Sequence, residues 1–244
     1  MSAWYKTWFN SENYLDLYKH RGDEDAENLI SLIWKNVDCN KIKSVLDIAC
    51  GAGRHSIKIA GKGLKVTAFD ISLNLLKIAK TTADELSLDV DFFCGDIKKP
   101  CIKTSFDLVT NLFTSFGYFE KDEENFALFA DVYKYLGKDG CFCFDYFNID
   151  YLKRNLVPFS CSEENGKKIT QKREFSANRV IKDIIIADGE QNEYFQESVA
   201  LYSKEEIETE LKKNEFRIEN IYGDYFGSVF NQTESPRLII FARK

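Results

Sequence analysis

Residues 45–56 read VLDIACGAGRHS, and this stretch decides the predicted fold. A short apolar run takes in Asp47, gives way to small residues with Gly51 and Gly53, and continues in a pattern typical of a helix. The two glycines permit a tight turn and let a ligand approach the backbone closely. A carboxylate beside such a turn leaves two ligands open: a dinucleotide, or a nucleoside that carries an amino acid.

Strand-like and helix-like segments alternate regularly on both sides of this turn. Buried strands are predicted at 44–49, 65–70, 89–94, 106–111, 141–147, 216–223 and 237–244. Helical patterns lie between them: to about residue 60, from the cap Ser72 onward, from about 122 to 136, and from Ser203 to about 214. This alternation predicts an α/β fold with a doubly wound, mostly parallel seven-stranded sheet and helices on both faces.

Residues 167–202 have a different rhythm. Three alternating segments are separated by turn signals at 177–178 and 188–189, which predicts a three-stranded antiparallel meander. We therefore expect a core formed by 41–150 and 203–244, with 151–202 inserted as a small antiparallel β unit. An aromatic-rich helical segment, 1–40, precedes the core.

Composition narrows the class of protein. The chain has 244 residues, a net charge of −6 and no apolar run of the ~20 residues that a membrane span needs. Affinity for nucleic acid depends on basic residues, which are not in excess, so a small molecule or a protein is the favoured substrate, and no membrane is expected. Seven cysteines without a C-x-x-C pair, and only two histidines, predict no metal site and reduced, buried thiols in a cytoplasmic protein. Cys141 and Cys143 share one face of a strand, which indicates core positions.

Four carboxylates fall near predicted strand ends: Asp47, Asp70, Asp96 and Asp145. In a doubly wound sheet, ligands bind beyond the carboxyl ends of the strands. Asp70 follows Gly51 at the separation expected of a carboxylate that binds ribose hydroxyls. Either ligand named above would satisfy it.

Asp47 discriminates between the two candidate ligands. It lies close to where a dinucleotide's pyrophosphate would rest on the helix N-terminus, and it would repel that group. S-adenosylmethionine carries no phosphate and has two cationic groups, an ammonium and a sulfonium. Asp47 therefore favours S-adenosylmethionine.

From Val45 to about Asp145, with the two closing strands, the sequence resembles the class I S-adenosylmethionine-dependent methyltransferases. Their acidic-x-G-x-G-x-G motif corresponds to residues 47–53, with Ala49 in place of the first glycine. The resemblance implies that the cofactor is S-adenosylmethionine and that the following residues bind it: Asp47, Ala49, Gly51, Gly53, Asp70 with Ile71 at the ribose, Asp96 with Ile97 at the adenine, and Asn111 with Leu112 in a loop over the methionine part.

The N-terminal segment adds three candidates. Tyr14, Tyr18 and Arg21 follow one another at roughly one-turn spacing, so they share a helical face. In related small-molecule methyltransferases such a segment lies over the cofactor. Arg21 is the candidate for binding the methionine carboxylate. The alternative is an amphipathic helix that only packs on the domain.

Methyl transfer is a direct in-line displacement, and the resemblance names no general base. His20, Asp145 and Tyr146 are the candidates, whereas His55 is expected to be structural and neutral. Aromatic residues are expected to line the acceptor pocket or to pack in the core: Phe113, Phe116, Tyr118 and Tyr225. The β insertion resembles that of glycine and sugar-amine N-methyltransferases, where it covers the acceptor or forms a homodimer contact, so a small soluble acceptor is favoured.

Three other functions remain open at the level of sequence, and the net negative charge disfavours one of them, RNA modification. An NAD-dependent dehydrogenase would use the same glycine turn and Asp70, although Asp47 argues against it. A non-catalytic binding subunit is permitted by Ala49 and by the absence of a clear base.

Overall fold

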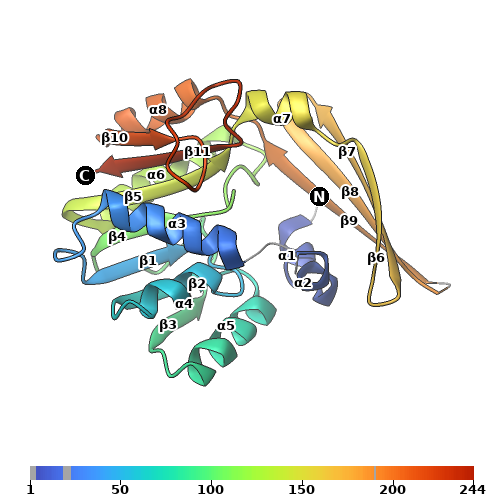
Figure 1. Cartoon of the computed structure of the whole chain (residues 1–244), viewed down its shortest axis with the longest axis horizontal. Helices are drawn as coiled ribbons and strands as arrows, with labels where there is room; N and C mark the ends of the chain where they lie inside the picture. Colours follow the sequence, from blue (N-terminus) through green and yellow to red (C-terminus); the bar gives the residue numbers. More distant parts are fainter. Residues whose placement is uncertain (1–3, 19–22, 190) are drawn as a thin grey trace.

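The computed structural model describes residues 4–18, 23–189 and 191–244. Two sheets lie at opposite ends of the molecule with short N-terminal helices between them (Figure 1). The larger, sheet A, has seven strands: β1 (Ser44–Ile48), β2 (Lys65–Asp70), β3 (Val90–Cys94), β4 (Phe106–Asn111), β5 (Leu136–Phe147), β10 (Arg217–Tyr222) and β11 (Arg237–Arg243).

Sheet A has the order β10-β11-β5-β4-β1-β2-β3. The pairs β1–β2, β2–β3, β1–β4 and β4–β5 are parallel, and β11 runs antiparallel to both of its neighbours. The predicted doubly wound, mostly parallel seven-stranded sheet is confirmed. The chain reverses its direction across the sheet between β1 and β4, where ligands bind in folds of this kind.

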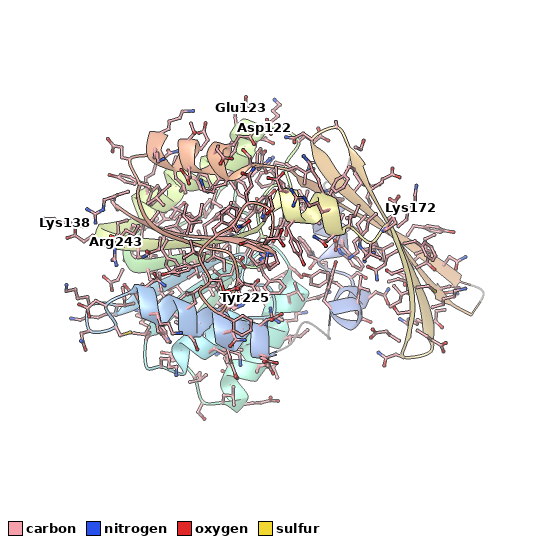
Figure 2. The ribbon with its side chains drawn as sticks, turned by 45° about the horizontal axis from the view of Figure 1, so that its top comes forward. Asp122, Glu123, Lys138, Lys172, Tyr225 and Arg243 are labelled. Carbon is pink, nitrogen blue, oxygen red and sulfur yellow. The ribbon has the colours of Figure 1, made fainter. Side chains whose placement is uncertain are left out.

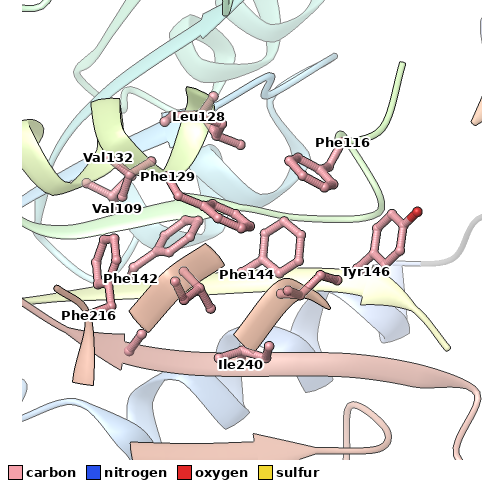
Figure 3. Packing of buried hydrophobic residues seen from close by; sticks show 14 of the residues in the cluster. Val109, Phe116, Leu128, Phe129, Val132, Phe142, Phe144, Tyr146, Phe216 and Ile240 are labelled. Atoms are coloured by element: carbon pink, nitrogen blue, oxygen red, sulfur yellow. The ribbon is translucent and has the colours of Figure 1, made fainter. Parts of the chain in front are cut away.

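Helices cover both faces of sheet A (Figure 1). Apolar residues of α3 (Asp23–Asn36), α4 (Arg54–Ala60) and α5 (Leu73–Glu85) form one buried cluster, and those of α6 (Asp122–Tyr135) and α8 (Lys204–Lys213) form the other. Figure 3 shows the second cluster, in which Phe129 of α6 packs against Phe142 and Phe144 of β5. Sheet A is thus packed on both faces by apolar cores.

The smaller sheet, sheet B, is antiparallel in the order β6-β7-β8-β9 and comprises β6 (Phe159–Glu164), β7 (Lys167–Ser176), β8 (Arg179–Asp188) and β9 (Gln191–Ala200). The prediction of three strands is wrong by one, because β6 was missed. Its sequence, FSCSEE, has no apolar alternation since it is the edge strand and is mostly exposed. The tight turn at Asn165-Gly166, with φ of 52° and 79°, was the available signal.

Three short helices complete the fold: α1 (Trp4–Trp8), α2 (Glu12–Tyr18) and α7 (Ile149–Asn155). Helices α1 and α2 lie between sheet A and sheet B (Figure 1), and Trp8 and Leu17 are buried against Ile169, Ile184 and Ile186 of sheet B. The N-terminal segment therefore joins the two sheets rather than packing on sheet A alone.

The cysteines correct one prediction. Cys141 and Cys143 are buried as expected, but other cysteines, Cys39, Cys94, Cys101 and Cys161, are exposed. Cys94 and Cys161 lie on edge strands of the two sheets, where an apolar neighbourhood in sequence does not ensure burial. Within the described ranges, no helix is both long and apolar enough to cross a membrane.

Candidate active site

A cavity of about 670 Å³ lies where the carboxyl ends of sheet A face the inner side of sheet B. Its walls come from the loops after β1, β2, β3 and β4, from α1 and α2, and from β7, β8 and β9. This volume is in the range of small-molecule and cofactor sites. The predicted site residues that line it are Tyr14, Tyr18, Asp47, Ala49, Gly51, Asp70, Ile71, Asp96, Ile97 and Leu112.

Asp47 lies near the end of β1, at the base of the cavity. It is 2% exposed, and its two oxygens accept hydrogen bonds from Ser56 Oγ at 2.5 Å and Thr110 Oγ1 at 2.8 Å. Burial raises the pKa of Asp47 to about 6, against the lowering effect of these two hydroxyls. The carboxylate is thus pre-positioned, and it is ionised at neutral pH.

Ala49 begins the glycine turn in a left-handed conformation, with φ of 58°. This conformation is favourable for glycine and strained for alanine. The backbone therefore keeps the shape that a glycine would give it, although the residue carries a Cβ.

Asp70, the last residue of β2, connects the two neighbouring loops. Its Oδ2 accepts from Gly51 N and its Oδ1 from Ser72 N, each at 2.8 Å. Burial raises the pKa of Asp70, although these backbone donors oppose the shift. Each oxygen keeps a further lone pair, so the carboxylate can still accept hydrogen bonds from a ligand in the cavity.

Gly53 does not line the cavity. It is the N-cap of α4, with φ of 75°, and a Cβ there would lie 2.8 Å from Ala79 Cβ and 3.1 Å from Phe92 Cζ. The structure thus gives Gly53 a packing role between α4, α5 and β3. The family motif carries a glycine here because the helix must approach the sheet closely.

Asp96 and Ile97 form the wall after β3. Asp96 Oδ1 accepts from Lys98 N at 3.0 Å, and Lys6 Nζ of α1 lies 3.7 Å from Asp96 Oδ2. Lys98 lies over the Phe119 ring at 4.3 Å on the same wall. The loop turn holds the carboxylate, which stays open to the cavity.

Asn111 and Leu112 follow at the end of β4. Asn111 is fully buried, and its Nδ2 donates to the carbonyl oxygens of Ile48 and Ser115, each at 3.2 Å. Because both partners are acceptors, the amide orientation is fixed, and Asn111 Oδ1 is buried without a donor among the described residues. Of these two predicted site residues, Leu112 lines the cavity and Asn111 lies behind the wall.

The loop after Leu112 is strained and is held by a buried ion pair. Phe113 and Thr114 are both left-handed, with φ of 60° and 63°. Asp145 Oδ2 accepts from Phe113 N at 2.8 Å, while Arg237 Nη2 lies 2.7 Å from Asp145 Oδ1 and donates to Thr114 Oγ1 at 2.9 Å. Phe113, Thr114 and Arg237 line the cavity, but Asp145 is fully buried behind them. Asp145 is therefore placed to support the loop rather than to reach a substrate.

Tyr146, Phe116 and Tyr225 do not line the cavity, so for these three residues packing, rather than a place in the acceptor wall, describes the structure. Tyr146 is fully buried with Phe116 in the cluster under α6 (Figure 3). Its hydroxyl donates to the Ala200 carbonyl oxygen. Tyr225 donates to Asp145 Oδ2 at 3.1 Å and stacks on Phe113. Burial raises the pKa of Tyr146 well above its ordinary value, so it is not a base.

The N-terminal helices supply an aromatic cover. Tyr14 and Tyr18 line the cavity together with aromatic residues that the sequence did not single out for the site, Trp4, Tyr5 and Phe9. Tyr118, after β4, lines it as well and lies 5.2 Å from the Trp4 ring. The candidates Arg21 and His20 lie outside the described residues.

His55 was expected to be structural, yet it lines the cavity. Burial, together with the positive charges of Arg54 and Lys58, lowers the pKa of His55 to about 3, so the ring is neutral as expected. Its Nε2 is buried without a partner in the described part of the chain.

Sheet B contributes polar residues that sequence reasoning missed: Gln171, Arg173, Lys182 and Glu197. Glu197 accepts from Trp8 Nε1 at 2.7 Å and from the Tyr18 hydroxyl, and Lys182 Nζ lies 3.5 Å from Glu197 Oε2. The only sequence feature that could have indicated these residues is their place in the alternating pattern of their strands, where each occupies an inward-facing position. Tyr18 is thereby held in a network with sheet B.

Comparison with known proteins agrees with this geometry. Residues 45–140 match the model of the methyltransferase domain family. A protein of Geobacillus sp. (strain WCH70) named as a methyltransferase is 30% identical over 125 residues, which is 50% of this chain and 51% of that protein. The chain thus spans about half the length of this relative.

Two solved structures share the whole fold. An S-adenosylmethionine-dependent methyltransferase from Clostridium acetobutylicum has a TM-score of 0.82 at 22% identity, with 95% of this chain and 97% of that chain covered. CalS10, an amino pentose methyltransferase from Micromonospora echinaspora, has a TM-score of 0.70 at 17% identity, with 96% and 97% covered. The chain therefore has the class I methyltransferase fold, including sheet B.

Proposed function

We propose that this protein is an S-adenosylmethionine-dependent methyltransferase that transfers a methyl group to a small soluble acceptor. The observation that carries the proposal is the pair of buried carboxylates at the glycine turn, Asp47 and Asp70. Asp70 is bonded to Gly51 N and Ser72 N, and Asp47 is bonded to Ser56 and Thr110. Two negative charges in one wall favour a cationic ligand without phosphate.

The residues present fit the cofactor. In our proposal Asp70 holds the ribose hydroxyls, and Asp96 and Ile97 hold the adenine. Asp47 attracts the positive charge of the cofactor. When bound, S-adenosylmethionine supplies an electrophilic methyl group.

The walls beyond the carboxylates suit a small acceptor. Sheet B, α1 and α2 close the cavity from the side opposite sheet A, which leaves room for a metabolite-sized group. CalS10, which shares this arrangement, is named for an amino sugar substrate. In-line transfer to a neutral amine needs alignment of the two reactants more than a general base, and alignment is worth ~7–11 kcal/mol.

Calorimetry tests the proposal. S-adenosylhomocysteine, the demethylated cofactor, should bind the wild-type protein with micromolar affinity, and NAD(H) should give no heat. Asp70→Asn should weaken that binding roughly 10- to 100-fold, because it removes a charged hydrogen-bond acceptor. Asp91→Asn, an exposed aspartate on β3, should leave it unchanged. Absence of binding to the wild type would reject the function.

A further inference from the structure

Two donor side chains lie side by side on the inner face of sheet B. Gln171 and Arg173 are at alternate positions of β7, so they point to the same side, and both line the cavity. Lys172, between them, is exposed on the outer side and pairs with Glu174 at 2.7 Å (Figure 2). One strand thus places a guanidinium and an amide against the acceptor space.

The orientation of Gln171 follows from its partner. Arg173 Nη2 lies 2.6 Å from Gln171 Oε1. A guanidinium can only donate, so the amide oxygen must face it and the amide NH₂ points away from it. Gln171 is 8% exposed, and its NH₂ has no acceptor within the described ranges, although it is open to the cavity.

Arg173 has unused N–H donors, and no carboxylate among the described residues pairs with it. Its described acceptors are Gln171 Oε1, Ser160 Oγ at 3.1 Å and the Val157 carbonyl oxygen at 3.3 Å, all neutral. A guanidinium has five N–H donors, so about two of them remain. None of the residues that the structure describes gives Arg173 an ion pair.

The register of sheet B increases the positive charge at this point. Arg173 lies directly opposite Lys182, and Lys182 lies opposite Glu197. Glu197 pairs with Lys182 at 3.5 Å, so the single carboxylate of the row is on the far side from Arg173. Like charges directly opposite one another destabilise a sheet, and a bound anion would relieve that repulsion.

We propose that the methyl acceptor carries an anionic oxygen group, a carboxylate or a phosphate, and that Arg173 and Gln171 bind it. This inference rests on the proposed methyltransferase function. Asp47, Asp70 and Asp96 then lie at the cofactor end of the cavity and Arg173 lies at the acceptor end, while Arg54 and Arg237 also line the sheet A side. Anchoring the acceptor at its anionic end leaves its nucleophilic atom directed toward the cofactor.

The test uses the full chain saturated with S-adenosylhomocysteine and two probes, malonate and inorganic phosphate, at constant ionic strength. The dissociation constant of each probe is measured by calorimetry. Arg173→Gln should weaken binding roughly 10- to 100-fold and Gln171→Leu by a smaller factor. Lys172→Gln, which removes the same charge from the outer face of the same strand, should leave it unchanged.

The two arms separate the chemistries: tighter binding of malonate assigns a carboxylate, and tighter binding of phosphate assigns a phosphate. Equal loss in Arg173→Gln and Lys172→Gln, or no binding of either probe to the wild type, would overturn the proposal. So would loss of S-adenosylhomocysteine binding in Arg173→Gln, since Arg173 would then hold the cofactor's own carboxylate. Arg173→Lys, which keeps the charge, should retain part of the affinity and guards against misfolding of the first variant.

A wild type that does not bind S-adenosylhomocysteine would reject the methyltransferase function separately. The probes would then be titrated into the protein alone, and the comparison of Arg173→Gln with Lys172→Gln would still decide whether an anion site exists there.

Discussion

The two ends of the cavity are built from different kinds of structure. At the sheet A end, loops at the carboxyl ends of parallel strands present Asp47, Asp70 and Asp96, whose oxygens are held by nearby backbone N–H groups and hydroxyls. At the sheet B end, Arg173 and Lys182 stand on strand faces and are held by neighbours across the sheet. The positions of the side chains at the sheet A end depend on short loops, and those at the sheet B end depend on the pairing register of the strands.

Because of this difference, the two ends of the cavity tolerate different amounts of side-chain substitution. Loop geometry around the glycine turn is fixed by the cores on both faces of sheet A, so it suits a ligand that does not change. The inward positions of sheet B can be exchanged without altering its hydrogen bonding, because only side chains project into the cavity. We therefore expect acceptor choice to be set by sheet B and cofactor choice by sheet A.

The buried ion pair at the junction of the two ends should give the largest effect. Arg237→Met removes the ion-pair partner of the buried Asp145, and this should lower the free energy of unfolding by about 3–5 kcal/mol. Arg243→Met is the matched control at the far end of the molecule (Figure 2), where the partly exposed pair with Glu219 contributes about 0–1 kcal/mol. Urea unfolding measures the change in unfolding free energy for both variants. Equal losses would show that the Arg237–Asp145 pair contributes no more than a partly exposed ion pair.

Asp47 allows the sheet A end to be tested by pH. Its folded pKa of about 6 lies above the ordinary 3.8, so the folded state holds the proton more tightly and the wild type loses stability as pH rises through about 4 to 6. The loss is about 3 kcal/mol, from a shift of roughly two pKa units. In Asp47→Asn this loss should be absent, so the difference in unfolding free energy between the two proteins should change with pH.

The control for this pH effect has the opposite sign. Burial raises the pKa of Asp107, but hydrogen bonds from Lys43 and Ser44 outweigh it and lower the pKa overall. Asp107 therefore stabilises the fold above its ordinary pKa. The wild type gains unfolding free energy from this group as pH rises, and Asp107→Asn should lack that gain.

For Asp47, the difference in unfolding free energy between the wild type and Asp47→Asn should change from pH 4 to 7. A constant difference would contradict the burial of an ionisable group at the turn.

The same contrast explains what the sequence could predict. The parallel sheet and the carboxylates Asp47, Asp70 and Asp96 are encoded in contiguous stretches, each a strand followed by its own loop, so spacing alone located them at the cavity. Arg173 meets Lys182 through the pairing of β7 with β8. No short sequence pattern predicts this contact, because it depends on the register in which the two strands of the hairpin pair.

Tyr146 was misplaced for a related reason. Successive residues of a strand point to opposite faces, so Asp145 and Tyr146 could not both face one acceptor pocket. In the structure Asp145 faces the Arg237 side, and Tyr146 enters the core under α6 with Phe144. The alternation was visible in the sequence, but which face meets the cavity depends on how β11 and the β4 loop pack.

The two glycines of the turn test how tightly the sheet A end is packed. Gly53→Ala would place a Cβ 2.8 Å from Ala79 Cβ in a left-handed residue, which should cost about 2–3 kcal/mol of unfolding free energy. Gly51→Ala has the same backbone conformation with nothing within 4 Å of the new Cβ, and should cost about 1 kcal/mol. Thermal unfolding compares them; equal costs would remove the packing role assigned to Gly53.

Ala49 gives the smallest effect, of the opposite sign. Its φ of 58° strains the backbone by about 1–2 kcal/mol, and glycine would relieve this at an entropic cost of about 0.5–1 kcal/mol. Ala49→Gly should therefore raise the free energy of unfolding by about 0.5 kcal/mol and leave S-adenosylhomocysteine affinity nearly unchanged. Ala52→Gly, in the same turn but outside the residues with positive φ, should lower stability instead. If both substitutions destabilise the protein, the turn does not hold Ala49 in the left-handed region, and the equivalence of this turn with the family's glycine motif fails at that residue.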